Sequence, residues 1–230
     1  MWKIFKRLAF NTSYLFRPRW DTGVPAPEII RYVNVKAPGN AIDIGCGTGT
    51  NLLYLAQQKW KVTGIDFAPL AIKAAHRKLE QYSTTLLVAD VTKLYDLHLP
   101  GPYDLALDMG CFHSLTNIDR EDYVKGLEKW VTQDGVYMVY AFQPSANNGR
   151  GISKEEMIAY FKNEFDLLNY EQGQGRPSAW YYFERKYRKP VPRRRRSRME
   201  TLRDQPILWL LPGSVPKNRQ EQACLISVPL

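Results

Sequence analysis

The sequence predicts an α/β protein with a mostly parallel sheet of seven strands, helices on both faces and an antiparallel last strand. Short apolar segments typical of buried strands alternate with segments of helical periodicity over most of the chain. A glycine-rich turn at residues 45–49 follows the first of these strands. Each of the first four strands also carries an aspartate at or near its C-terminal end, the edge where open α/β sheets bind ligands.

The elements follow from these patterns in chain order. Pro69 suits the first turn of a helix, and Ser153 with Glu156 forms a helix-capping pattern. A turn at residues 134–135 is expected to precede the fifth strand, and residues 171–177 are expected to be the loop of a final β-hairpin. Helices are expected between the first six strands. The expected strands are residues 41–44, 61–66, 84–89, 103–107, 136–142, 165–170 and 178–183, and the expected helices include residues 27–33, 50–58, 123–131 and 153–161.

The turn and the aspartates together indicate a binding site. The glycines let the backbone pass close to a ligand, and the helix that begins at Thr50 directs its free N–H groups at the same place. Asp66 follows Gly45 by 21 positions, the spacing of an acid that accepts hydrogen bonds from ribose hydroxyls in nucleotide-binding folds. A single aspartate of this kind is better explained by a helix cap or a turn, but four of them at one edge favour a ligand.

Residues 41–49, AIDIGCGTG, resemble the glycine-rich first motif of class I S-adenosylmethionine-dependent methyltransferases, and the resemblance extends over roughly residues 18–185. Asp43 stands two positions before the first glycine, where dehydrogenase fingerprints usually have no acid. The resemblance implies a Rossmann-like fold and S-adenosyl-L-methionine as the cofactor. The cofactor contacts that it implies are Asp43, Gly45 and Gly47 for the methionine part, Asp66 for the ribose, Phe67, Asp90 and Val91 for the adenine, and Asp108 and Met109 for the floor beneath the sulfonium.

The first 35 residues are expected to form a lid or cap. Residues 1–20 are basic and rich in aromatic residues, and the alternatives to a cap are an organelle-targeting presequence and a membrane-surface helix. Residues 20–28, WDTGVPAPE, resemble a segment that closes the active site in bacterial small-molecule methyltransferases of the thiol, halide and tellurite-resistance-like kinds. That resemblance implies Trp20 as a wall beside the sulfonium; the alternative is an ordinary core tryptophan.

The loop after the fourth strand is expected to shape the acceptor pocket. Residues 110–114, GCFHS, resemble the same loop of the small-molecule relatives, which implies that Phe112 and His113 line the pocket together with Trp20. His113 is the candidate catalytic base, since imidazole accepts a proton near neutral pH. Orientation of the acceptor is the alternative role, because methyl transfer from a sulfonium needs little beyond alignment.

Composition narrows the class of protein. With 230 residues and 44% hydrophobic content, the chain suits one domain with appendages. Three cysteines without a C-x-x-C pair argue against a disulfide framework or a zinc site, and no metal is expected. No run of about 18 apolar residues is present, so no membrane span is expected. We expect a cytoplasmic protein, with peripheral membrane association as an alternative.

The charge of the chain is concentrated at its C-terminal end. Residues 1–183 hold 20 Lys/Arg and 19 Asp/Glu, whereas residues 184–230 hold 12 and 4. We therefore expect a methyltransferase-like domain at residues 36–185 and an Arg-rich tail without ordered structure at residues 186–230. The basic run at residues 186–198 suits weak contact with anionic lipid or RNA, a nuclear-import address or no special role, and no stable partner is implied.

These observations favour methyl transfer to a small-molecule acceptor by in-line attack on the sulfonium methyl group. Residues 108–111, DMGC, differ from the Asp/Asn-Pro-Pro-aromatic motif that nucleic-acid amino methyltransferases usually show after the fourth strand. An RNA or protein methyltransferase that uses the Arg-rich tail is the first alternative. A non-catalytic cofactor-binding or membrane-docking protein is the second.

Overall fold

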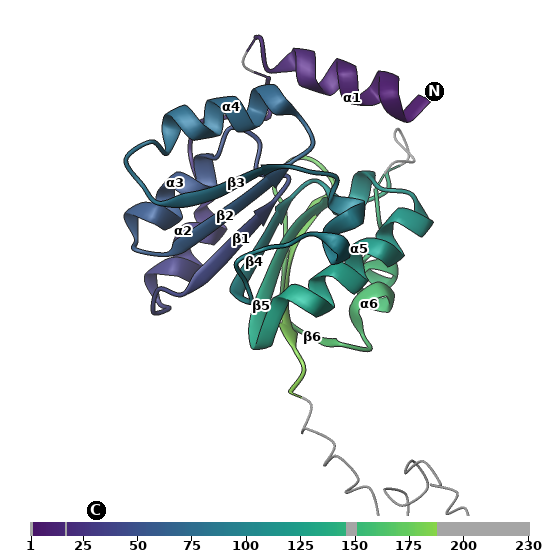
Figure 1. Ribbon diagram of the computed structural model, residues 1–230. Helices are drawn as coiled ribbons and strands as arrows, with labels where there is room; N and C mark the ends of the chain where they lie inside the picture. Colours follow the sequence, from purple (N-terminus) through teal and green to yellow (C-terminus); the bar gives the residue numbers. More distant parts are fainter. Residues whose placement is uncertain (1, 17, 146–150, 188–230) are drawn as a thin grey trace, which may run out of the picture. The chain divides into compact units, whose positions relative to one another are not determined.

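The computed structural model describes residues 2–16, 18–145 and 151–187, and their side chains from residue 8 onward. One sheet contains seven strands in the order β3-β2-β1-β4-β5-β7-β6 (Figure 1). The strands are β1 (Asn40–Ile44), β2 (Lys61–Asp66), β3 (Thr84–Val88), β4 (Tyr103–Met109), β5 (Val131–Phe142), β6 (Phe165–Gln172) and β7 (Ser178–Arg185). The helices are α1 (Trp2–Ser13), α2 (Pro27–Asn34), α3 (Thr50–Gln57), α4 (Pro69–Lys78), α5 (Asn117–Trp130) and α6 (Lys154–Phe161), with the 3-10 helices η1 (Val91–Asp96) and η2 (Phe112–Ser114).

The strand directions confirm the predicted fold class. β7 runs antiparallel to its neighbours β5 and β6, and the other paired strands are parallel. The chain fills the sheet from β1 outward to β3 and then returns to the opposite side of β1 with β4. Because the order reverses between β1 and β4, a ligand crevice is expected at the C-terminal ends of these two strands.

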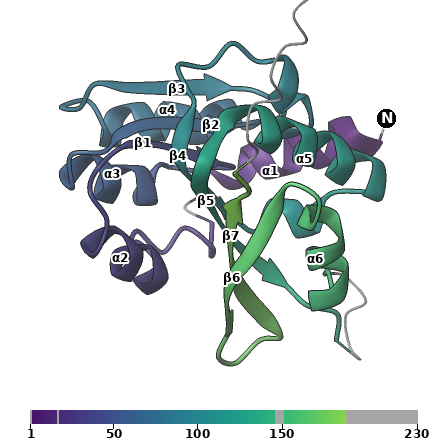
Figure 2. The same ribbon diagram turned by 90° about the horizontal axis from the view of Figure 1, so that it is seen from below.

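Helices cover both faces of the sheet (Figures 1 and 2). On one face, α2, α3 and α4 pack over an apolar cluster that includes Leu52 and Met138. On the other face, η1, α5 and α6 pack over a cluster that includes Tyr137 and Phe161. Tyr137 and Met138 are neighbours in β5 but belong to opposite clusters, because successive side chains of a strand point to opposite faces.

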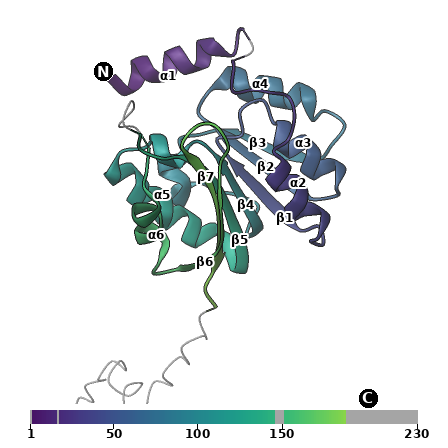
Figure 3. The ribbon, with the colours of Figure 1, turned by 180° about the vertical axis from the view of Figure 1, so that it is seen from behind.

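The helix α1 lies outside these two layers, beside α4 and near the glycine-rich turn (Figure 3). The side-chain oxygen of Asn11 accepts a hydrogen bond of 3.0 Å from the N–H of Leu70, in the first turn of α4. This N–H is one of the groups that a helix leaves without an internal partner, so Asn11 joins the end of α1 to the start of α4.

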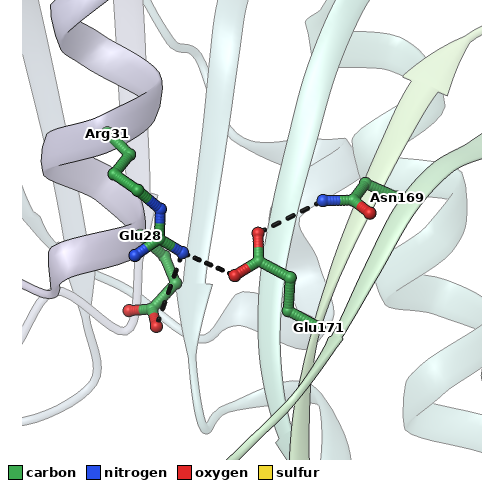
Figure 4. Close-up of polar contacts among 4 residues, drawn as sticks. All are labelled: Glu28, Arg31, Asn169 and Glu171. Carbon is green, nitrogen blue, oxygen red and sulfur yellow. Dashed lines mark hydrogen bonds and ion pairs between the residues drawn. The ribbon is translucent and has the colours of Figure 1, made fainter.

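The helix α2 is anchored to the rest of the domain on two sides. Ile29 is fully buried in the cluster beneath the helix. On the outer side, Arg31 contacts Glu28 of the same helix and Glu171 of β6, and Asn169 donates to the same Glu171 carboxylate (Figure 4). Because Arg31 is largely exposed, the ion pairs contribute only about 0.2–1 kcal/mol. The buried side of α2 therefore provides most of its attachment.

The folded domain extends beyond the boundaries that the sequence predicted. Ala26 and Val33 are buried in the cluster beneath α2, so only residues before Ala26 remain as a cap. At the other end, the N–H of Lys186 donates to the carbonyl of Glu164 at 2.8 Å. Within the described residues, no helix is long and apolar enough to cross a bilayer. Residues 188–230 of the tail lie outside the described residues, and contact of the tail with lipid or RNA stays a prediction, as does the cytoplasmic location.

Two helical segments differ from the prediction, and in each of them a polar residue that caps the first turn explains the difference. α5 begins at Asn117 rather than at residue 123, because the Thr116 hydroxyl accepts a hydrogen bond from the N–H of Asp119 and caps an earlier turn. Between β3 and β4, the chain forms the 3-10 helix η1 and not the expected α-helix. Asp90 caps this short turn by accepting from the N–H of Thr92.

The start of β5 also differs from the prediction. Val131 was expected to end a helix, but it pairs with Tyr103 of β4 as the first residue of the strand. Asp134, with a φ of 64°, lies in the irregular segment before Val136 resumes the pairing with Leu105. The expected turn at residues 134–135 is thus an irregularity within a longer strand.

Candidate cofactor and acceptor site

The glycine-rich turn is held against β2 and touches the loop after β4. The N–H groups of Gly45 and Cys46 both donate to the carbonyl of Ile65, at 2.7 and 2.9 Å. Gly45 has a φ of 81°, and a Cβ at this position would lie 3.3 Å from the Cβ of Cys111. A side chain here would strain the backbone and press the two loops apart. The predicted cofactor loop and the predicted acceptor loop are therefore in contact.

Asp43 is a buried carboxylate beneath the turn. Its Oδ2 atom has no hydrogen-bond partner among the described residues, although the Asn51 side chain bonds to the carboxyl group. Burial, with the carboxylates of Asp108 and Asp66 nearby, raises the pKa of Asp43 to about 8. An unsatisfied buried carboxylate is costly, so this position favours a cationic ligand group.

Asp66 connects the end of β2 to the turn. Its carboxylate accepts hydrogen bonds from the N–H of Gly47 at 2.9 Å and from the N–H of Ala68 at 2.8 Å. Burial raises the pKa of Asp66, and these backbone donors oppose that rise. Phe67 follows on the surface of the site and meets the ring of Phe10 edge-on, with centroids 5.7 Å apart. Asp66 and Phe67, two of the residues predicted to hold the ribose and the adenine, thus lie next to the turn.

Asp90 and Val91 lie at the C-terminal end of β3. Asp90 accepts hydrogen bonds from both the N–H and the hydroxyl of Thr92, at 3.0 and 2.9 Å. Val91 packs its side chain into the cluster on the α5 side of the sheet. The side chain of Val91 therefore belongs to the core, and the expected contact of its N–H with the adenine stays a prediction.

Asp108, which was predicted to form the floor beneath the sulfonium together with Met109, holds the loop after β4 with its side chain. The carboxylate is fully buried and accepts hydrogen bonds from the N–H groups of Cys111 and Phe112 and from the hydroxyl of Tyr123. Burial raises the pKa of Asp108 to about 6, although these donors favour the charged form. Asp108 thus supports the acceptor loop from below. Met109 points to the opposite face, where its sulfur accepts from the Asn51 amide at 3.2 Å.

The ring of Phe112, which was predicted to line the acceptor pocket, lies in the core of this structure. The ring is fully buried and packs against Tyr123, Tyr160 and Phe161. The N–H of Phe112 bonds to the carboxylate of Asp108, which turns the side chain into the core. Phe112 therefore fixes the loop to the helices α5 and α6 and leaves the next residue, His113, at the edge.

His113 begins a row of aromatic rings on the α2 side of the sheet. Its ring lies 4.8 Å from that of Phe142, which is followed by Tyr140 at 5.7 Å and then by Trp180 at 5.5 Å. The carbonyl of His113 accepts a hydrogen bond of 3.0 Å from the guanidinium of Arg120. Phe142 and Tyr140 alternate along β5, so they share one face and reach the edge beside the acceptor loop.

The N-terminal segment covers the glycine-rich turn with aromatic side chains. The hydroxyl of Tyr14 would lie 3.4 Å from a Cβ at Gly47, and it accepts a hydrogen bond from the indole N–H of Trp20 at 3.4 Å. Burial and the nearby Asp66 raise the pKa of Tyr14 to about 12, so this hydroxyl stays neutral. Trp20 also packs against Phe10. This arrangement agrees with a cap over the cofactor loop.

A cluster of polar side chains fastens this segment to the turn. Thr48 and Thr50 donate hydrogen bonds to the two carboxylate oxygens of Asp21, at 2.8 and 3.4 Å. The ammonium of Lys78 donates to both threonine hydroxyls, each at 2.8 Å. Gly49 provides no side-chain cap for α3, so the Asp21 carboxylate complements the positive end of that helix. We call these four residues the Asp21–Lys78 latch.

Comparisons with known proteins identify the family of this chain. A family described as "Methyltransferase domain" matches residues 41–135. A 2-heptyl-1-hydroxyquinolin-4(1H)-one methyltransferase of Mycobacteroides abscessus is 33% identical over 138 residues, which cover 56% of this chain and 58% of that protein. An uncharacterised methyltransferase of Schizosaccharomyces pombe is 34% identical over 109 residues, which cover 46% of this chain and 74% of that protein. The chain belongs to the class I S-adenosylmethionine-dependent methyltransferases.

Solved methyltransferase structures share the fold. The 1,6-didemethyltoxoflavin-N1-methyltransferase of Burkholderia thailandensis has a TM-score of 0.66 at 18% identity, over 81% of this chain and 89% of that one. TehB of Haemophilus influenzae has a TM-score of 0.61 at 18% identity, over 77% and 67% of the two chains. Both structures resemble this chain in their fold. The chain spans little more than half the length of the M. abscessus relative.

The residues around the turn of this methyltransferase fit S-adenosylmethionine. The Oδ2 atom of Asp43 is suited to the ammonium group of the methionine part, because that pairing would satisfy both charges. The Asp66 carboxylate has two backbone donors and offers about four lone-pair sites, which leaves acceptors for ribose hydroxyls. When bound, the cofactor supplies an electrophilic methyl group on a positively charged sulfur.

The structure gathers most of the predicted site of this methyltransferase at one edge of the sheet. Near the turn lie Asp43, Gly45, Gly47, Asp66, Phe67, Met109 and Trp20, the last of these through its bond to Tyr14. His113 lies on the loop after β4, which contacts the turn through Cys111. Asp90 lies at the end of β3, and Phe112 and the side chains of Val91 and Asp108 face the core. The sequence reasoning missed Tyr14, Asn51, Lys78 and Phe142. The alternation of Tyr140 and Phe142 at the end of β5 was a signal for one of them.

Proposed function

We propose that this methyltransferase transfers the methyl group of S-adenosylmethionine to a small acceptor with a planar aromatic ring. The observation that carries the proposal is the row of rings from His113 through Phe142 and Tyr140 to Trp180. The row begins at His113, on the loop whose Cys111 contacts the glycine-rich turn. An aromatic acceptor would extend it at the spacing of favourable ring pairs, which is about 4.5–7 Å. Apolar walls with a few polar groups are typical of small-molecule sites.

The names of two similar proteins support an acceptor of this kind. The M. abscessus relative is named for a hydroxyquinolinone, and the B. thailandensis structure for a didemethylated toxoflavin. Both names describe methyl transfer to a small heteroaromatic compound.

In the proposed reaction, the chain aligns its two ligands and handles one proton. Asp43 would bind the ammonium and Asp66 the ribose, which would hold the cofactor beside the acceptor loop. A lone pair on the acceptor oxygen or nitrogen forms the bond to the methyl carbon while the carbon–sulfur bond breaks, and the sulfur keeps its electron pair in S-adenosylhomocysteine. His113 accepts the proton that the acceptor loses, or it orients the acceptor ring. In-line placement supplies much of the rate.

Cofactor labelled on its methyl group tests the proposal. The protein is incubated with this cofactor and a whole-cell extract, and small molecules, RNA, protein and lipid are then separated. We expect label in the small-molecule fraction, in compounds that absorb ultraviolet light as aromatic rings do. Label confined to RNA or protein would contradict the proposal, and label only in non-aromatic small molecules would contradict the acceptor class.

A further inference from the structure

The N-terminal segment has an apolar surface that the domain leaves uncovered. Its inner side chains, Phe10 and Tyr14, contact Phe67 and Trp20. Four other apolar side chains are largely exposed, and we call them the outer apolar surface: Leu8 at 56%, Leu15 at 61%, Phe16 at 84% and Trp20 at 56%. Such a concentration of exposed apolar side chains within one short segment is unusual for a surface that faces only water.

The charge of this segment differs in sign from that of the rest of the domain. Residues 1–20 hold five Lys/Arg and no Asp/Glu, and the described Arg19 is exposed. Residues 21–183 hold 15 Lys/Arg and 19 Asp/Glu. An anionic surface would therefore attract the N-terminal segment and weakly repel the remainder, which orients the molecule.

The positive charge and the exposed apolar groups together indicate which partner binds this surface. Two copies of the chain that met through it would bring two strongly cationic segments together, which disfavours self-association. An anionic bilayer satisfies both features, because the basic residues meet lipid headgroups and the apolar side chains enter the acyl boundary. Tryptophan is also favoured at that boundary, where its ring is buried and its N–H can still find a partner.

We propose that the outer apolar surface docks this protein on an anionic lipid bilayer while the inner side chains stay on the cofactor loop. The same segment then lies between the bilayer and the site, so an acceptor dissolved in the membrane would enter beside Trp20. The docking itself is independent of which acceptor is methylated. It therefore stands or fails separately from the proposed transfer reaction.

Vesicle flotation of the full-length protein tests the docking. The lipid is phosphatidylcholine, either alone or with about one quarter phosphatidylglycerol. The test variant is Leu15→Ser/Phe16→Ser, and the matched control is Val35→Ser/Ile118→Ser, whose residues are exposed at 79% and 74% outside the segment. We expect the test variant to partition onto anionic vesicles about tenfold more weakly and the control to stay within about twofold of the natural chain. Because all three proteins carry the Arg-rich tail, its contribution is the same in each.

Three outcomes would overturn the docking proposal. In the first, the test variant floats as well as the natural chain, so that the tail alone accounts for binding. In the second, neutral vesicles bind the protein as well as anionic ones. In the third, Leu15→Ser/Phe16→Ser abolishes a dimer seen by sedimentation and leaves vesicle binding unchanged. The affinity of the test variant for S-adenosylhomocysteine, which we expect to be unchanged, verifies that it is folded.

Discussion

Asp43 is the residue whose protonation should control ligand binding most directly. Its pKa is about 8 in the folded protein, compared with 3.8 for an ordinary carboxyl. Between these values the folded state keeps a proton that the unfolded state has released. The free energy of unfolding of the ligand-free protein should therefore fall as the pH rises from about 4 to about 8. A bound ammonium favours the charged carboxylate, so ligand binding should have the opposite dependence on pH.

We expect the affinity for S-adenosylhomocysteine to rise between about pH 6 and pH 8, by up to about tenfold per pH unit, as Asp43 ionises. The variant Asp43→Asn should bind more weakly at about pH 8 and should lose most of this slope, because it has no proton to release. Titration calorimetry at three pH values measures both effects. Parallel slopes in the two proteins would assign the pH dependence to another group.

His113 offers a test of the chemical step. The variant His113→Ala should lower turnover by about a hundredfold if the imidazole accepts the proton of the acceptor, since general bases contribute at least that much. Its affinity for S-adenosylhomocysteine should stay within about twofold, because the proposed ligands of the ammonium and the ribose, Asp43 and Asp66, lie at the ends of other strands. His98→Ala, at an exposed position in the loop before β4, is the matched control. Equal turnover of His113→Ala and the natural chain would show that His113 is not a base.

At the scale of elements, the Asp21–Lys78 latch joins the N-terminal segment to α3 and α4. Removal of the Lys78 ammonium in Lys78→Met withdraws the donor from both threonine hydroxyls. A hydrogen bond to a charged group contributes about 1.5–3 kcal/mol. Because Asp21 keeps its own bonds to both threonines, we expect the segment to lose only part of this energy and to open about threefold to tenfold more often. Trypsin cleavage after the exposed Arg19 should accelerate accordingly, and mass spectrometry of the fragments measures it.

The control for the latch is Lys73→Met, an exposed lysine on the same helix α4. Its cleavage rate at Arg19 should match that of the natural chain. S-adenosylhomocysteine should slow cleavage of both variants if the segment closes over the cofactor. Indistinguishable rates for Lys78→Met and Lys73→Met would mean that the latch does not hold the segment.

Local patterns predicted the existence and the type of most elements, and contacts across the sheet decided where they end. The capping box at Ser153 and Glu156 forms as expected, because both of its hydrogen bonds are local. The start of β5 was not predictable in the same way. Val131 belongs to the strand because it pairs with Tyr103, which is distant in sequence. The helical pattern before Val131 gives no sign of that partner.

The site was predictable where backbone geometry and strand order decide it, and less so where side-chain direction does. Gly45 and Asp66 meet because parallel strands end at one edge. Phe112 and His113 are neighbours in sequence, but the ring of Phe112 enters the core and the ring of His113 packs against Phe142 of β5. That choice depends on the bond between the Phe112 N–H and the buried Asp108 carboxylate, a contact that no periodicity reveals.

At the scale of the whole molecule, charge is divided unevenly between the domain and its C-terminal extension. Residues 1–183 are nearly neutral, and residues 184–230 hold eight more basic than acidic residues. If the extension bound RNA through six or more phosphate contacts, affinity would fall by about 10³ or more between roughly 50 and 200 mM salt. A small aromatic acceptor has no such dependence. The dependence of activity on salt concentration therefore distinguishes an RNA acceptor from a small aromatic one.

A chain that ends at Tyr187 should keep the activity proposed here. It retains the hydrogen bond from the Lys186 N–H to the carbonyl of Glu164, so the end of the β6–β7 hairpin stays intact. It loses the basic run. We expect its turnover of the small-molecule acceptor to lie within about twofold of the full chain and to change little between roughly 50 and 200 mM salt, because every proposed contact precedes residue 188. Methyl-transfer assays of both chains at the two salt concentrations measure this. A loss of activity that follows both truncation and added salt would instead make the extension the binding surface for a polyanionic acceptor.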